Sequence, residues 1–124
     1  MSVSRAFLGR NLRFMSSTAT PVLHKFVLFA PDAKDARRSD VQKQHRQDIR
    51  PFIDSGVVKV AAPMITPESF QSKDQKTFGS VIIYEGETLE AVRKMVESDI
   101  YYTSGVWDRD RLVLLPILPV TPFP

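Results

Sequence analysis

The chain has 124 residues, 43% of them hydrophobic, which is the size and composition of one globular domain. It has no cysteine, so disulfide bonds, thiolate metal sites and cysteine nucleophiles are excluded. It has two histidines, and zinc sites use three or four protein ligands, so we expect no metal. No apolar run approaches the ~20 residues of a membrane span, so we expect no membrane partner.

The net charge of +3 comes from the first 20 residues. Arg5, Arg10 and Arg13 are the only charged side chains there, and the rest of the chain has 14 basic side chains against 14 acidic ones. A nucleic-acid-binding protein usually carries a clear basic surplus on one face. The neutral body of the chain therefore disfavours nucleic acid as a partner.

Residues 1–20 have the composition of a mitochondrial targeting segment, because they are rich in Arg and Ser and contain no acidic residue. As a helix, this segment gathers its apolar side chains on one half and its arginines on the other. A secretory signal is disfavoured, since no uninterrupted apolar core of ~7–15 residues is present. We expect a mitochondrial matrix protein with a domain at 21–124. The alternatives are a tail without function and a cytoplasmic form that starts at Met15.

Strands and helices are expected to follow in the order strand, helix, strand, strand, helix, strand. The expected strands are short, apolar and rich in β-branched or aromatic residues, at 25–30, 57–62, 77–85 and 111–118. The expected helices lie at 33–55 and 88–98, where apolar residues recur at helical spacing.

Capping residues and a proline define the expected ends of the helices. Asp32 and Gly56 are suited to the two ends of the first helix, and Thr88 to the start of the second. Pro51 predicts a kink or break near Arg50. The many charged side chains of the first helix most simply form a solvated face.

This order of elements is the ferredoxin-like pattern, an α+β fold with a four-stranded antiparallel sheet and two helices on one face. Pro116 places the last strand at the sheet edge. Three of the strands are apolar on both faces, although two helices can cover only one face. An apolar face of that size marks an interaction site. The simplest cover is the same face of a second copy, so we expect a homodimer.

His45 lies on the apolar face of the first expected helix. The apolar residues of that face are Val41, Ile49, Phe52 and Ile53. An unpaired buried polar group costs roughly 1–3 kcal/mol, so His45 needs a partner. Asp99 follows the C-terminal end of the second helix, where the helix dipole disfavours a carboxylate, so it needs a partner too.

Two connecting segments have open interpretations. Residues 63–76 are polar, and they form either a flap over a site or a plain surface loop. Residues 100–109, expected to be a loop, carry Tyr101, Tyr102 and Trp107. These aromatic side chains either line a pocket or cap the core.

Residues 25–119 resemble a YCII-related domain, the YciI-like branch of the dimeric α+β barrels. The resemblance rests on the order and spacing of short features: His45 within the first helix, Ala61-Ala62-Pro63, Gly79-Ser80, Glu87-Thr88-Leu89-Glu90-Ala91, and Asp99 followed by Tyr101 and Gly105. Two departures, Ile100 for the usual proline and Ala62 for the usual glycine, change the shape of the expected pocket.

The resemblance implies that His45 and Asp99 form a dyad in a cleft near the dimer interface. His45 then acts as a general base or acid on a small organic substrate. The expected substrate-binding residues are Ser80, Phe78, Tyr101, Tyr102 and Trp107. The alternative is a non-catalytic ligand-binding or scaffold dimer, in which the His45–Asp99 pair fixes helix packing. No cofactor motif is present and we expect no cofactor; haem would need His45 as its axial ligand.

Overall fold

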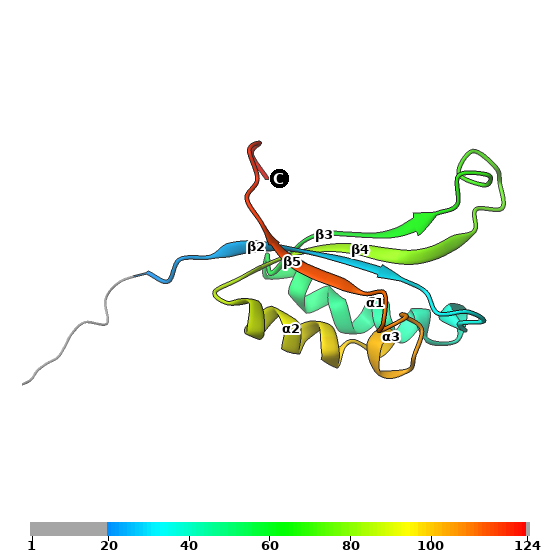
Figure 1. The fold of residues 1–124 in the computed structure, drawn as a ribbon, viewed down its shortest axis with the longest axis horizontal. Coiled ribbons are helices and arrows are strands. Elements are labelled where there is room, and N and C mark those ends of the chain that lie inside the picture. Colours follow the sequence, from blue (N-terminus) through cyan, green and yellow to red (C-terminus); the bar gives the residue numbers. More distant parts are fainter. Residues whose placement is uncertain (1–19, 124) are drawn as a thin grey trace, which may run out of the picture.

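The computed structural model describes residues 20–123, so the expected targeting segment lies outside the described residues apart from Thr20. Within them, four strands form one antiparallel sheet, and helices cover one of its faces (Figure 1). The elements in chain order are β2 (His24–Pro31), α1 (Arg38–Asp54), β3 (Val58–Ile65), β4 (Thr77–Gly86), α2 (Leu89–Ser98), α3 (Ile100–Thr103) and β5 (Val113–Ile117). The expected α+β, ferredoxin-like fold is therefore confirmed.

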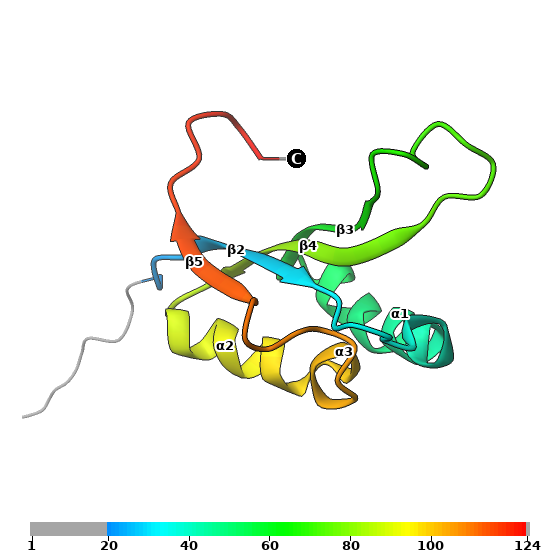
Figure 2. The ribbon, with the colours of Figure 1, turned by 45° about the vertical axis from the view of Figure 1, so that its right-hand side comes forward.

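The strand order is β3-β4-β2-β5, with every neighbouring pair antiparallel. β5, which contains Pro116, is an edge strand as expected. Leu28 on the central strand β2 lies opposite Ile82 of β4 and Leu114 of β5, and all three are buried. The core thus lies between this face of the sheet and the helices, which Figure 2 shows on one side only.

α1 begins at Arg38, five residues later than expected, and Asp32 does not cap it. The carboxylate of Asp32 instead accepts two hydrogen bonds from the guanidinium of Arg38, both 2.9 Å long. The helix continues through Pro51 to Asp54, so the expected break does not occur. Its C-terminal end is as expected, since Gly56 follows with a φ of 83° that favours glycine. No helix in the described range is long and apolar enough to cross a bilayer.

Phe52 does not share the buried face of α1, contrary to expectation. Its side chain is 40% exposed, whereas Ile49 is buried and Val41 and Ile53 pack against the core. At 100° per residue, Phe52 falls between Val41 and His45 around the helix axis, so helical spacing does not explain its exposure. Phe52 lies in the last turn of α1, which ends at Asp54.

Residues 100–109 contain a short helix, α3, where a loop was expected. Asp99 ends α2 and begins α3, and its side chain accepts the backbone N–H of Tyr101 at 2.9 Å. A carboxylate is favoured at a helix N-terminus, so the start of α3 compensates for the unfavourable end of α2.

The segment between β3 and β4 extends away from the body of the domain (Figure 1). It is closed by its own hydrogen bonds: the hydroxyl of Ser69 accepts the backbone N–H of Lys76 at 2.9 Å and lies 2.6 Å from the hydroxyl of Thr66. These contacts favour the surface-loop interpretation over a flap.

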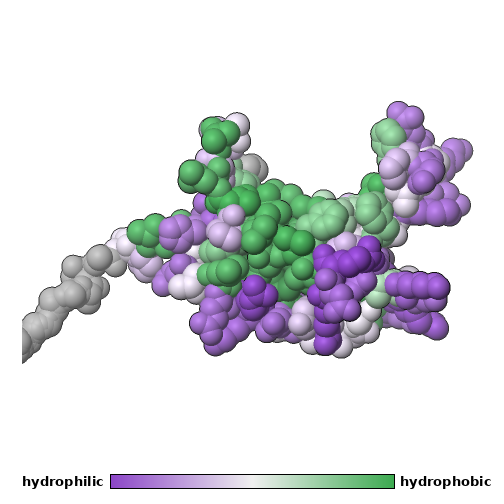
Figure 3. Space-filling model, in the orientation of Figure 1, coloured by the Kyte–Doolittle hydropathy of each residue, from purple (hydrophilic) through white to green (hydrophobic). Residues whose placement is uncertain are grey.

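The face of the sheet opposite the helices is apolar. Figure 3 shows hydrophobic side chains over the strands and hydrophilic ones over the helices. The exposed or half-buried apolar residues of this open face are Val27, Phe29, Val81, Ile83, Val113 and Leu115. The homodimer expected from the strand pattern remains a prediction.

Candidate functional site

A cavity of about 200 Å³ lies between α1 and the strands β3 and β4. Its apolar lining residues are Ile49, Ile53, Ala61, Ala62, Pro63 and Ile82. Its polar lining residues are Arg38, Gln42, His45, Arg46, Ser80 and Tyr101. Most of the polar side chains come from α1 and most of the apolar ones from the strands, so a ligand here meets an apolar wall and a polar wall.

His45 lines this cavity and is in direct contact with Asp99, which does not line it. Nδ1 of His45 lies 2.8 Å from Oδ1 of Asp99, and the two side chains are 13% and 11% exposed. The same carboxylate oxygen accepts the N–H of Tyr101, which fixes its position. An ionised carboxylate only accepts hydrogen bonds, so Nδ1 is the donor. Nε2 is then the ring nitrogen left for a ligand.

Tyr101 lies against the imidazole of His45. The two rings are stacked, with centroids 3.9 Å apart and an interplanar angle of 11°. Trp107 packs edge-on to both rings, and the guanidinium of Arg38 lies 4.6 Å from the centre of the Tyr101 ring. Burial raises the pKa of the Tyr101 hydroxyl, so the phenol stays neutral at physiological pH.

Ser80 joins Arg38 to the aromatic cluster. Its hydroxyl accepts a hydrogen bond from Nη2 of Arg38 at 2.8 Å and another from Nε1 of Trp107 at 3.1 Å. Burial by itself lowers the pKa of Arg38, but the hydrogen bonds and charge of Asp32 outweigh it and hold that pKa above its usual value. Arg38 is therefore a permanently charged group whose charge Asp32 balances.

Of the five expected substrate-binding residues, two line the cavity, one lies behind it and two lie outside it. Ser80 and Tyr101 line the cavity, while Trp107 is 1% exposed and lies behind them as their support. Tyr102 and Phe78 do not line it. The ring of Tyr102 packs under the guanidinium of Arg109, whose central carbon lies 4.3 Å from the ring centre. Phe78 is 41% exposed near the start of β4, next to the loop that extends from the domain.

Sequence reasoning missed four polar residues of the site: Asp32, Arg38, Gln42 and Arg46. Arg38 and Arg46 are among the charged side chains that were expected to form a solvated face of the first helix, but both line the cavity, as does Gln42. The four-residue spacing that placed His45 on an inward face also leads back from Arg46 to Gln42 and Arg38, so this signal was present. Nothing in the sequence indicates the pairing of Asp32 with Arg38.

His45 is the one histidine, cysteine or acidic residue among the residues that line the cavity. In the part of the chain that the structure describes, no three His, Cys, Asp or Glu side chains gather where they could hold a metal ion. Nε2 of His45 is the nitrogen that could reach a haem iron. A volume of about 200 Å³ is, however, below the ~300–1,000 Å³ of pockets that take drug-sized ligands, and haem is larger still.

The chain is similar in sequence to fungal and bacterial proteins, although no protein-family model matches it. Fusaric acid biosynthesis protein 2 of Gibberella moniliformis is 29% identical over 96 residues, which are 76% of this chain and 92% of that protein. Protein YciI of Escherichia coli is 29% identical over 85 residues, which are 67% of this chain and 87% of that protein. Both matches span nearly the whole of the related protein.

The fold is also similar to that of a solved structure. That solved structure is of the 5-chloro-2-hydroxyhydroquinone dehydrochlorinase TftG from Burkholderia phenoliruptrix, in complex with 2,5-dihydroxybenzoquinone. The TM-score is 0.63 at 20% sequence identity, and the match covers 73% of this chain and 89% of that chain. At this level of identity the likeness concerns the fold.

Proposed function

Since the chain belongs to the YciI-like family, we propose that it is a small-molecule enzyme in which His45 and Asp99 perform general acid–base chemistry. The observation that carries this proposal is the contact between Nδ1 of His45 and the carboxylate of Asp99, 2.8 Å long, at the wall of a cavity. Asp99 orients the imidazole and stabilises the imidazolium that forms when Nε2 takes a proton. The adjacent apolar wall is suited to a small cyclic substrate.

The reaction class proposed is proton abstraction from a carbon or hydroxyl group, leading to isomerisation, lactone chemistry or elimination. The dehydrochlorinase of similar fold supports elimination as a class by analogy of fold. In such a step Nε2 of His45 takes the proton, the electron pair of the broken bond forms a double bond, and the leaving group departs with its own electron pair.

The test is a turnover screen of the full chain with 5-chloro-2-hydroxyhydroquinone and a five-membered unsaturated lactone. Exchange of substrate protons for deuterium in D₂O, followed by NMR, reports proton abstraction even where no product accumulates. We expect His45→Gln to lower the rate by about 10²–10⁴-fold. His24→Gln is the matched control, because the only other histidine of the chain is exposed and lies outside the cavity.

Asp99→Asn separates catalysis from structure. Asparagine is as good an N-cap as aspartate, so this variant retains the cap of α3 while it removes the charge that faces His45. We expect lost activity with a nearly unchanged melting temperature. Retention of full activity in both His45→Gln and Asp99→Asn would contradict the proposal.

The alternative is a non-catalytic ligand-binding or scaffold protein. One observation favours it: the carboxylate of Asp99 joins α1 to α3, because it contacts both His45 and the backbone of Tyr101. In this case His45→Gln lowers the melting temperature markedly, and no variant of the pair changes any turnover.

We also propose that the protein forms a homodimer through the open face of the sheet. The apolar residues that remain exposed there, Phe29, Val113 and Leu115, support this arrangement. α1 and its cavity lie on the helical side of the sheet, so this dimer leaves the cavity wall formed by α1 uncovered.

A further inference from the structure

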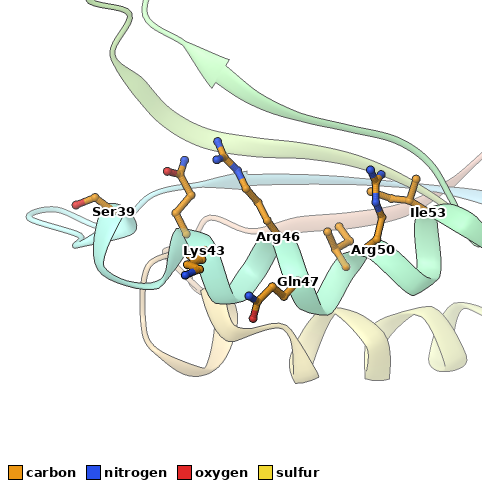
Figure 4. A pocket seen from close by; sticks show the side chains of 8 residues that line it. Ser39, Lys43, Arg46, Gln47, Arg50 and Ile53 are labelled. Atoms are coloured by element: carbon orange, nitrogen blue, oxygen red, sulfur yellow. The ribbon is translucent and has the colours of Figure 1, made fainter.

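A second, larger hollow adjoins the cavity that contains His45. This outer hollow has a volume of about 640 Å³, and all of its lining residues belong to α1 (Figure 4). The two share four lining residues, Gln42, Arg46, Ile49 and Ile53. A ligand in the inner cavity is therefore in reach of side chains that belong to the outer hollow.

The outer hollow is strongly basic. Its charged lining residues are Lys43, Arg46 and Arg50, and no Asp or Glu is among the residues that line either space. Two of the three acidic residues of α1 have partners elsewhere, since Asp40 pairs with Arg37 and Asp48 accepts a hydrogen bond from Gln44; the third, Asp54, is the last residue of the helix and lines neither space.

These three cations are free to bind an anion. Among residues 20–123, none of Lys43, Arg46 and Arg50 takes part in an ion pair, whereas Arg38 deeper in the cavity is balanced by Asp32. Figure 4 shows Arg46 and Arg50 extending from α1 toward the strands. Arg46 is the one free cation that lines both spaces.

We propose that the substrate is a small cyclic organic acid whose carboxylate is bound by Arg46 at the mouth of the cavity. The ring lies inside, against the apolar wall that includes Ala61 and Ile82, and within reach of His45. The inference rests on the proposed function, because it names the substrate class of the same site. The planar guanidinium of arginine matches a carboxylate through two parallel hydrogen bonds.

The size and lining of the cavity support one ring rather than a longer ligand. The inner volume of about 200 Å³ is small, and its strand wall offers only apolar contacts from Ala61, Ala62, Pro63 and Ile82 besides the hydroxyl of Ser80, which already accepts two hydrogen bonds. The charge of Arg38 inside the cavity is already balanced by Asp32, so a carboxylate is favoured at the entrance, where Arg46 is exposed to water.

The experiment is an NMR titration of the full chain with benzoate and, separately, with benzamide, its uncharged isostere, at equal ionic strength. The side-chain ¹H–¹³C signals of His45 report occupation of the cavity, and those of exposed His24 serve as an internal reference. We expect benzoate to shift the His45 signals in a saturable manner and benzamide to bind at least about tenfold more weakly, because a hydrogen bond to a charged group is lost.

Arg46→Gln is the critical variant, and Arg93→Gln on α2 is its matched control. Both residues are exposed helix arginines that lose the same charge, but Arg93 lies outside both spaces. We expect Arg46→Gln to raise the Kd for benzoate about tenfold or more and Arg93→Gln to leave it unchanged. Equal binding of benzoate and benzamide, equal binding by Arg46→Gln and the native chain, or no binding of benzoate would each overturn the inference.

The outcomes distinguish this inference from the proposed function. Benzoate binding that depends on Arg46, together with no proton abstraction from either test compound, supports the carboxylate site at Arg46 and contradicts the proposed enzyme. If turnover of the uncharged lactone depends on His45 but is unaffected by Arg46→Gln, and benzoate does not bind, the proposed enzyme is supported and the carboxylate site at Arg46 is refuted.

Discussion

The imidazole of His45 and the phenol ring of Tyr101 are stacked 3.9 Å apart, and the carboxylate of Asp99 bonds to both residues. Asp99 accepts a hydrogen bond from the backbone N–H of Tyr101 at the start of α3, and it accepts another from Nδ1–H of His45 on α1. One carboxylate therefore determines the position of both rings.

The neutral imidazole of His45 carries its proton on Nδ1. A carboxylate accepts hydrogen bonds and cannot donate one, so the contact of 2.8 Å requires this tautomer. Long-range ¹H–¹⁵N correlation spectra of the native chain should show a protonated Nδ1 and an unprotonated Nε2. Observation of the opposite tautomer would show that the contact with Asp99 is not formed in solution.

Asp32→Asn should destabilise the domain by about 3 kcal/mol, because it leaves the guanidinium of Arg38 unpaired in a site where both side chains are nearly buried, 11% and 12% exposed. Adding Arg38→Met should restore part of this loss, since the unpaired charge is then absent. Urea unfolding measures both. Arg37→Ala breaks the exposed pair with Asp40 and should cost less than ~1 kcal/mol. If the two single variants cost the same, the Asp32–Arg38 pair is not a buried one.

Ser80→Ala should cost about 1–3 kcal/mol, because Nε1 of buried Trp107 loses its acceptor and Nη2 of Arg38 loses one of its two. The chain has one tryptophan, so its fluorescence emission reports this change directly during urea unfolding. Ser98→Ala on the exposed side of α2 is the control and should change stability by less than ~0.5 kcal/mol. Equal effects of the two substitutions would contradict the role given to Ser80.

Tyr84 should make the domain sensitive to alkali. Burial of its side chain, and then the charge of Asp99, raise the pKa of the Tyr84 hydroxyl above its usual value of about 10. The folded state thus resists deprotonation of this hydroxyl. The stability that the neutral hydroxyl contributes is fully present below pH ~10 and is lost as the pH rises further, by up to ~1.4 kcal/mol per pH unit.

Tyr84→Phe tests this, because phenylalanine has no group to titrate there. Urea unfolding of both proteins at pH 7 and at several values above pH 10 should show a growing stability advantage of the variant at high pH alone. Parallel curves for the two proteins through pH 11 would contradict the prediction.

Leu115→Lys should convert the proposed dimer into monomers. Leu115 is 54% exposed on the open face, and a dimer through this face would bury the introduced ammonium without a partner. Light scattering after gel filtration should give twice the mass of the 124-residue chain for the native protein and the single mass for the variant. Ala91→Lys adds the same charge on α2 and should remain dimeric. A native protein that is monomeric at micromolar concentration would refute the dimer itself.

The order of strands and helices, the edge position of β5 and the inward face of α1 could all be read from the sequence. Each depends on local patterns: apolar runs define the strands, Pro116 is tolerated best at an edge, and four-residue steps place His45 beside Ile49. Such patterns act over a few residues, so they survive without knowledge of the tertiary structure.

The tertiary structure alone decided where α1 begins and which side chains surround the cavity. Asp32 is suited to a helix cap by type, but the buried guanidinium of Arg38 binds it more strongly than free backbone N–H groups would. Phe78 and Tyr102 are aromatic like Tyr101, yet they lie outside the cavity, since Phe78 is 41% exposed and Tyr102 packs under the guanidinium of Arg109. The sequence determined the fold and drew attention to His45 and Asp99, whereas the polar wall made by Arg38, Gln42 and Arg46 depends on how α1 lies against β3 and β4, which no local pattern specifies.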